Sequence, residues 1–234
     1  MIDRGGISMK ATSFQKTQYI AKIGILSALA ALVMLVEIPL WFAPSFYELD
    51  LSEIVALLGG FSMGPVAGVL IEFFKVLLKL LIKGTTTAYV GDLANFLIGC
   101  AFVVPAAVIY RFRGKKSKKR AIFGLVAGGI TMTVVGAVIN YFILIPFFSR
   151  FYGIPLDGII SMGTALNGWI TDLKTLVFYA TTPFNLFKAV VDSVITAIIY
   201  PYLSPFLKKD YSLKHSISRS NVTSNDDHTH VSKM

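Results

Sequence analysis

Residues 51–82 read LSEIVALLGGFSMGPVAGVLIEFFKVLLKLLI, an apolar run that is interrupted at Gly64-Pro65. The part before the interruption, Leu51 to Met63, would rise only roughly 20 Å as a straight helix, which is short of a ~30 Å bilayer core. A proline has no N–H for the preceding turn, and the residue before a proline disfavours the helical conformation. The pair therefore predicts a tight hairpin between two helices, over 51–63 and 66–82.

Four further apolar runs accompany this hairpin, at Tyr19 to Phe42, Leu93 to Tyr110, Ala121 to Phe148 and Phe184 to Leu207. The 234-residue chain is 55% hydrophobic and 15% charged, with a mean hydropathy of +0.68, and is too apolar for an ordinary water-soluble domain. In a bilayer only helices and closed barrels satisfy the backbone hydrogen bonds, and the runs lack the alternation of barrel strands. The sequence therefore predicts an all-α, polytopic membrane protein with six transmembrane helices, and a barrel is the less favoured alternative.

The basic residues predict the orientation of these spans. The 22 Lys and Arg exceed the 13 Asp and Glu, and a dense basic block runs from Arg111 to Arg120. Six spans with a cytoplasmic N-terminus place this block inside, whereas fusing the second and third segments would place it outside, against the positive-inside rule. We expect both termini in the cytoplasm, and we attribute the net charge of +9 to topology and not to nucleic-acid binding. The predicted parts are a cytoplasmic segment over 1–18, a six-helix membrane domain over 19–207 and a disordered cytoplasmic tail over 208–234.

Several enzyme classes lack their motifs in this chain. Cys100 is the only cysteine, and the three histidines, His215, His228 and His230, all follow the last apolar run. This pattern argues against an internal disulfide, a cysteine-rich metal site and intramembrane histidine catalysis. Phosphate-binding, serine-nucleophile and zinc-protease motifs are also absent. We therefore expect no enzyme, no metal and no ATP site, with a lipid-modifying intramembrane enzyme as the less favoured alternative.

Polar residues near the first and second spans form an acidic cluster of Tyr47, Glu48, Asp50 and Glu53. Such a cluster forms either a solvated loop on the outer side or a lid over an outward-facing pocket. The sequence leaves both interpretations open.

A second cluster lies within the third span, where Glu72 and Lys75 are three residues apart and Lys79 comes four later. Glu72 and Lys75 are expected to share one helix face and neutralise each other, which makes insertion tolerable. Alternatively, Lys75 or Lys79 faces a binding cavity, or Lys79 extends to the interface.

The third cluster begins the last span. Asn185, Lys188 and Asp192 share one helical stripe, where the lysine and the aspartate can offset each other. The stripe is expected to face Asn140 and Tyr141 in the fifth segment. It serves either as a polar contact between helices or as the wall of a ligand pocket, and two amides, an ammonium group and aromatic rings suit a flat, neutral, hydrogen-bonding ligand.

Short polar residues connect the third and fourth spans. Thr85, Thr86 and Thr87 precede Asp92 and Asn95, and they either approach a polyol or form an ordinary turn. The long connection over 149–182 is expected either at the membrane interface or over the pocket.

The first span carries two pairs of small residues four apart, Gly24 with Ala28 and Ser27 with Ala31. Such stripes permit close helix approach. They serve either internal packing or docking of another membrane subunit.

Taken together, these features resemble the riboflavin-binding S components of energy-coupling-factor (ECF) transporters. The resemblance runs from about Ile20 to Leu207 and is carried by YELDLSEI (47–54), GPVAG (64–68), GDLANFLIG (91–99), NYF (140–142) and PFNLFK (183–188). It implies a vitamin-binding membrane subunit in the bacterial plasma membrane that captures riboflavin from outside. Its partners would be a transmembrane T component, contacted through Gly24, Ser27, Ala28 and Ala31, and two ABC-type ATPases. An S component for another vitamin is the alternative.

The resemblance also implies a role for each polar cluster. Riboflavin would be a transported ligand and not a cofactor, and Asn140 and Asn185 would contact its imide edge. Lys188 would donate to the ring and be held by Asp192. The remaining expected contacts are apolar or aromatic from Phe184, Phe142, Tyr141 and Leu97, and polar to the ribityl chain from Thr85, Thr86, Thr87 and Asn95. Lys75 is a further expected binding residue, on the interpretation that places it at the cavity.

Overall fold

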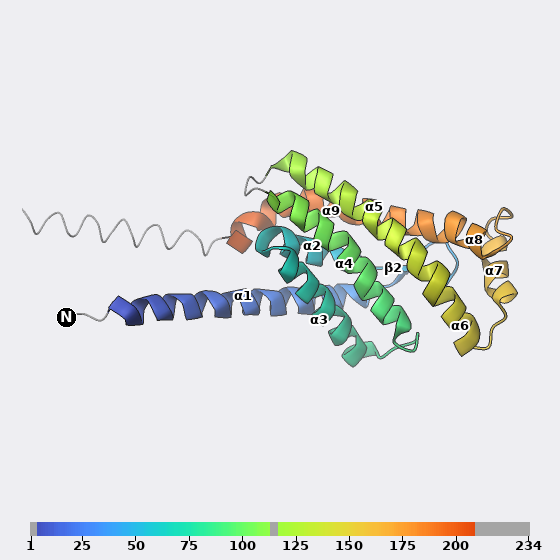
Figure 1. Ribbon diagram of the computed structural model, residues 1–234, viewed down its shortest axis with the longest axis horizontal. Coiled ribbons are helices and arrows are strands. Elements are labelled where there is room, and N and C mark those ends of the chain that lie inside the picture. The colour runs from blue at the N-terminus through green and yellow to red at the C-terminus, as the bar shows by residue number, and fades with distance from the viewer. Residues whose placement is uncertain (1–3, 113–116, 209–234) are drawn as a thin grey trace, which may run out of the picture. The chain divides into compact units, whose positions relative to one another are not determined.

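The computed structural model describes residues 4–112 and 117–208, and most of these are helical (Figure 1). The helices are α1 (Arg4–Met34), α2 (Ser52–Met63), α3 (Pro65–Lys83), α4 (Val90–Arg111), α5 (Lys118–Ile139), α6 (Ile145–Phe151), α7 (Leu156–Thr164), α8 (Leu173–Leu176) and α9 (Thr182–Lys208). Two short strands, β1 (Ile38–Pro39) and β2 (Glu48–Leu49), pair antiparallel within the connection between α1 and α2. The chain divides into two compact units after Ala197, and all the polar clusters singled out in the sequence lie in the first.

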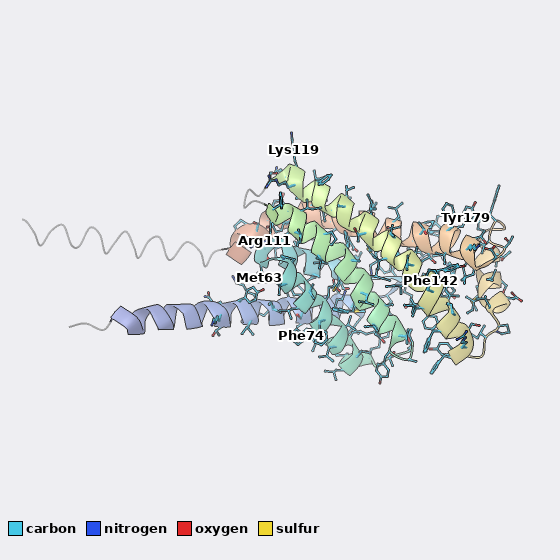
Figure 2. All side chains as sticks on the ribbon, in the orientation of Figure 1. Met63, Phe74, Arg111, Lys119, Phe142 and Tyr179 are labelled. Atoms are coloured by element: carbon cyan, nitrogen blue, oxygen red, sulfur yellow. The ribbon has the colours of Figure 1, made fainter. Side chains whose placement is uncertain are left out.

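The predicted hairpin is confirmed. Gly64 ends α2 with a φ of +119°, and its N–H donates to the Gly60 carbonyl at 2.9 Å. Pro65 occupies the first turn of α3, where no intrahelical donor is needed. At the same end of the bundle Arg111 of α4 donates to the Ser62 carbonyl at 2.8 Å, beside Met63 (Figure 2). The arginine therefore satisfies a free carbonyl in the last turn of α2.

The two last long helices extend beyond their predicted limits. The helix of α5 continues through a π-helical turn, η2 (Asn140–Leu144), into α6, and α8 continues through a second π-helical turn, η3 (Val177–Thr181), into α9. The predicted connection over 149–182 therefore contains α7 and the whole start of the last helix. Asp172 and Thr175 form a capping box that begins this helix eleven residues before the predicted Phe184.

An apolar cluster holds this extension in place. Ile159 of α7 packs with Ile145, Ile170, Leu176 and Val177. The connection over 149–182 is therefore a packed cap over the ends of the two last helices.

The described residues form an all-α membrane protein. Four helical stretches are long and apolar enough to cross a bilayer, at Lys16–Met34, Val90–Arg111, Lys118–Phe151 and Leu173–Pro205. α2 and α3 are not among these four stretches. α2 has only 12 residues, and α3 carries four charged side chains, which make it too polar. The predicted tail over 208–234 lies outside the described residues, apart from Lys208.

Candidate functional site

A cavity of about 210 Å³ opens where the connection between α1 and α2 meets α3, α4, η2 and α9. Three predicted site residues from distant parts of the chain, Asn140, Asn185 and Lys188, line it together. The lining also includes Phe184, Asn95, Thr86 and Thr87, as expected, and Tyr47, Asp50, Lys79, Asp92, Phe46 and Phe148. The central geometric prediction, that polar side chains of the last two long helices converge on one cavity, is confirmed.

The two amides are almost completely buried, each only 4% exposed. Asn140 begins η2 and donates to the Gly136 carbonyl at 2.8 Å, while Asn185 donates to the Thr181 carbonyl of η3 at 3.0 Å. π-helical turns often mark functional sites, because each inserts one residue and changes the direction of the side chains around it. Each amide uses one N–H on its own helix and keeps further donor and acceptor capacity for a ligand.

Lys188 has different partners from those predicted. Its ammonium group lies 2.6 Å from Asp50 Oδ2 and 2.9 Å from Glu53 Oε2. Asp192, the expected partner, has no hydrogen bond on either oxygen from any residue of 4–112 or 117–208. The prediction was wrong because the connection between α1 and α2 returns to α9 and brings closer carboxylates, which the spacing within one helix does not show.

The acidic cluster is solvated only in part: Glu48 is exposed, whereas the other two carboxylates are buried. Asp50 is 5% exposed and Glu53 is 1% exposed, and both carboxylates point into the protein toward lysines. Burial disfavours ionisation of Asp50, but the ammonium groups of Lys188 and Lys75 and a hydrogen bond from Ser52 outweigh it and hold the pKa of Asp50 well below its usual range. Asp50 therefore stays ionised and fixes the connection to α9.

Lys75 lies behind the cavity and does not line it. The predicted pair with Glu72 is confirmed at 2.6 Å, and Glu53 Oε1 lies on the other side of the ammonium group at 3.2 Å. All three side chains are buried. Glu53 thus bridges Lys75 and Lys188, and its two oxygens join α3 to α9 through the first turn of α2.

Another ion pair, which the sequence did not predict, also lines the cavity. Lys79 does not extend to the interface but lies 2.7 Å from Asp92 Oδ1, and both side chains are buried. Thr85 Oγ1 donates to Asp92 Oδ2 at 2.6 Å, and Thr87 Oγ1 donates to the same oxygen at 3.3 Å. We call Thr85, Thr86 and Thr87 the threonine loop. Thr85 lies outside the cavity and orders this loop through Asp92, whereas Thr86 and Thr87 line the cavity.

Tyr47 connects the first connection to both amide-bearing helices. Its hydroxyl donates to Asn140 Oδ1 at 3.0 Å and lies 2.6 Å from Thr181 Oγ1, and its ring stacks on Phe184 at 5.1 Å. Burial raises the pKa of Tyr47 well above its usual value, against the opposing effect of the Thr181 hydrogen bond. The neutral phenol is therefore a stable part of the wall.

Three of the predicted aromatic and apolar contacts are not brought to the cavity. Phe142 is 69% exposed on the surface of η2 (Figure 2), and Leu97 is 41% exposed on α4. Tyr141 packs instead against the apolar cluster around Ile145 and Ile159. The sequence had indicated aromatic residues near Asn140 but not their direction.

Comparison with known proteins identifies the family. The model of the family "ECF transporter, substrate-specific component" matches residues 18–200. The chain belongs to this family. It is therefore a transporter component and not an enzyme, as the missing catalytic motifs had predicted.

Relatives of this S component share most of their length with it. It is 34% identical over 197 residues to the "Riboflavin transporter RibU" of Staphylococcus aureus (strain TCH60), and this alignment covers 84% of this chain and 96% of the relative. It is 29% identical over 198 residues to the "Riboflavin transporter FmnP" of Bacillus subtilis (strain 168), in an alignment that covers 84% of this chain and 97% of the relative. A solved structure described as "Structure and mechanism of the S component of a bacterial ECF transporter" matches with a TM-score of 0.63 and 32% identity, over 82% of this chain and 99% of that one.

The small residues of α1 divide into two faces in this S component. Ser27 and Ala31 are each 1% exposed and pack inside the protein. Gly24 and Ala28 are exposed, and a side chain added at Gly24 would meet no described atom within 4 Å. The pair of Ser27 and Ala31 thus serves internal packing, and the pair of Gly24 and Ala28 lies on a free surface of α1.

Proposed function

We propose that this chain is the riboflavin-binding S component of an ECF transporter in the bacterial plasma membrane. It crosses the membrane six times, with α2 and α3 as the second and third spans and both termini in the cytoplasm. A T component and two ABC-type ATPases supply the energy. Support for riboflavin comes from the names of the relatives, of which the Staphylococcus aureus transporter is 34% identical.

The observation that carries this proposal is the meeting of Asn140, Asn185 and Lys188 at one cavity, each 4% exposed. Two amides supply alternating donors and acceptors for the imide edge of the isoalloxazine ring, and the ammonium group donates to a ring carbonyl. Because these groups are sheltered from water, hydrogen bonds to a neutral ligand retain much of their strength. Phe184, stacked on Tyr47, supplies an aromatic wall for the ring.

Further polar groups of the cavity lining suit the ribityl chain. Thr86 and Thr87 line the cavity, and Asn95 Oδ1, also at the cavity, is buried without a hydrogen-bond partner among the described residues. An unpartnered buried acceptor is costly, and a ligand hydroxyl would satisfy it. The threonine loop is already ordered by Asp92, so little conformational entropy is lost when the polyol binds.

The exposed pair on α1 is the contact that we assign to the T component. Gly24 and Ala28 leave a smooth surface that permits close helix packing, whereas Ser27 and Ala31 are already occupied by internal contacts. The partner helix would therefore lie along the Gly24 face.

Flavin fluorescence tests the vitamin assignment. Titration of riboflavin into the detergent-purified protein should quench the flavin with high affinity, and N185A and K188A should weaken binding by about ten- to a hundredfold, the range for a hydrogen bond to a charged or buried group. D157N, which changes an exposed carboxylate, is the matched control. Tight binding of a different vitamin with none of riboflavin would replace this assignment with another substrate.

A further inference from the structure

An unbalanced group of charges is buried beside the cavity. We call Asp50, Glu53, Glu72, Lys75, Lys188 and Asp192 the charge cluster, and each of them is at most 5% exposed. It contains four carboxyl groups and two ammonium groups. If all were ionised, two negative charges would remain without compensation inside the protein.

The two ammonium groups form ion pairs with three of the four carboxyl groups. Lys75 contacts Glu53 and Glu72, and Lys188 contacts Asp50 and Glu53. Asp192 is left over: it is completely buried, and neither of its oxygens has a hydrogen-bond partner in the part of the chain that the structure describes. Its charged neighbours are Glu53 of α2, Asp50 just before α2, Lys75 of α3, and Lys188 one turn earlier on α9. Asp192 thus faces into the cluster without a partner in it.

An unpaired carboxylate in such a place has two ways to lose its charge. A metal cation is disfavoured, because no group of three Asp, Glu, His or Cys side chains within the described residues is arranged to hold one. Protonation removes the charge without further ligands, and it is the usual response of a buried acid. The second excess negative charge is shared by the carboxyl groups that contact Lys75 and Lys188, and protonation of one of them would remove it in the same way.

We propose that the charge cluster is a proton-binding site that holds two protons at neutral pH, and that Asp192 carries one of them as a neutral carboxylic acid. The neutral acid leaves the Lys188 ammonium group directed toward Asp50 and the cavity. Loss of the proton would place a carboxylate one helical turn from Lys188, where it competes for the same ammonium group. Proton release from Asp192 would therefore withdraw Lys188 from the cavity wall and weaken ligand binding there; this second step rests on the proposed function.

Infrared difference spectroscopy tests the proton directly and needs no ligand. Spectra of the purified wild-type protein and of D192N at neutral pH should differ by the carbonyl band of a protonated carboxylic acid, which D192N lacks and which shifts in deuterium oxide. D157N, the matched control at an exposed aspartate, should instead lose only ionised carboxylate bands. A loss of carboxylate bands in D192N would overturn the proposal. If D192N does not fold, the wild-type spectrum still decides, since a neutral-pH spectrum without any protonated-carboxyl band contradicts it.

Riboflavin affinity across pH tests the link to the cavity. In the wild-type protein the dissociation constant should rise by about tenfold as Asp192 ionises on the alkaline side, the size of one lost charge-assisted hydrogen bond. D192N should lose this alkaline weakening, whereas D157N should keep it; the flavin's own ionisation affects all three proteins alike. An identical pH profile in D192N and wild type would overturn the link. A protein that binds no riboflavin at any pH would instead refute the proposed function, and the infrared result would stand.

Discussion

The ammonium nitrogen of Lys188 lies 2.6 Å from Asp50 Oδ2, although 138 positions of sequence separate the two residues. This contact fastens the connection between α1 and α2 to α9 at the wall of the cavity. Glu53 holds the same ammonium group at 2.9 Å and reaches Lys75 with its other oxygen. One lysine therefore joins the cavity to the deeply buried charges of Glu53 and Lys75.

Replacement of Lys188 by methionine should lower the free energy of unfolding by about 3 kcal/mol, since it removes one partner of a buried ion pair and leaves its carboxylates uncompensated. Denaturant titration in detergent micelles measures this change. Lys174→Met, at an exposed lysine, should stay within about 0.5 kcal/mol of wild type. Equal stability of the two variants would show that the buried pair is dispensable.

Acid should remove the contribution of Asp50 selectively. Because its pKa in the folded protein lies below that of the unfolded chain, ionised Asp50 stabilises the fold above the unfolded value of ~3.9, and this stabilisation declines as pH falls toward the folded value. The difference in unfolding free energy between wild type and D50N should therefore be greatest at neutral pH and shrink below about pH 4. A difference that grows on acidification would contradict the ion pair.

The Tyr47 hydroxyl bridges the two amide-bearing helices. Tyr47→Phe should therefore distinguish the contribution of its hydrogen bonds from that of its ring stacking. The variant keeps the ring on Phe184 and loses the hydrogen bonds to Asn140 and Thr181. We expect a loss of stability of about 1–2 kcal/mol and a few-fold weaker riboflavin binding. Thermal unfolding and flavin quenching measure both, with the exposed Tyr89→Phe as control. An unchanged affinity would remove Tyr47 from the site.

Gly99 of α4 lies against the Glu72 carboxylate, and a Cβ placed there would be 2.5 Å from Glu72 Oε2. Gly99→Ala should therefore displace Glu72 from Lys75 and destabilise the protein by about 1–3 kcal/mol. Gly168→Ala, where no described atom lies within 4 Å, is the control. Thermal unfolding of both variants tests the contact, and equal melting temperatures would contradict it.

The two faces of α1 should respond differently to a bulky residue. Ala28→Leu should reduce copurification with the T component at least about tenfold, because it blocks the free surface, while Ser27→Leu should destabilise the S component itself, because Ser27 is 1% exposed. Copurification and thermal unfolding distinguish the two effects. Normal assembly of Ala28→Leu would move the partner contact elsewhere.

Local sequence was sufficient for the class and for the pieces of the site. Apolar runs of membrane length, the break at Gly64-Pro65 and the shared face of Asn185 and Lys188 all derive from backbone geometry and the bilayer, which act over a few residues. The pair of Glu72 and Lys75 was predictable for the same reason, being one helical turn apart.

Tertiary structure alone decided which charges meet and which side chains face the cavity. Lys188 binds Asp50 and not Asp192, and Lys79 binds Asp92, because docking of separate helices brings these groups together at distances that no spacing within one helix encodes. η2 begins at Asn140, and only the buried amide of Asn140 reaches the cavity, whereas Tyr141 and Phe142, which the resemblance had placed at the ligand, lie elsewhere on the helix. The free face of α1 is likewise fixed only by which helices cover the rest of it.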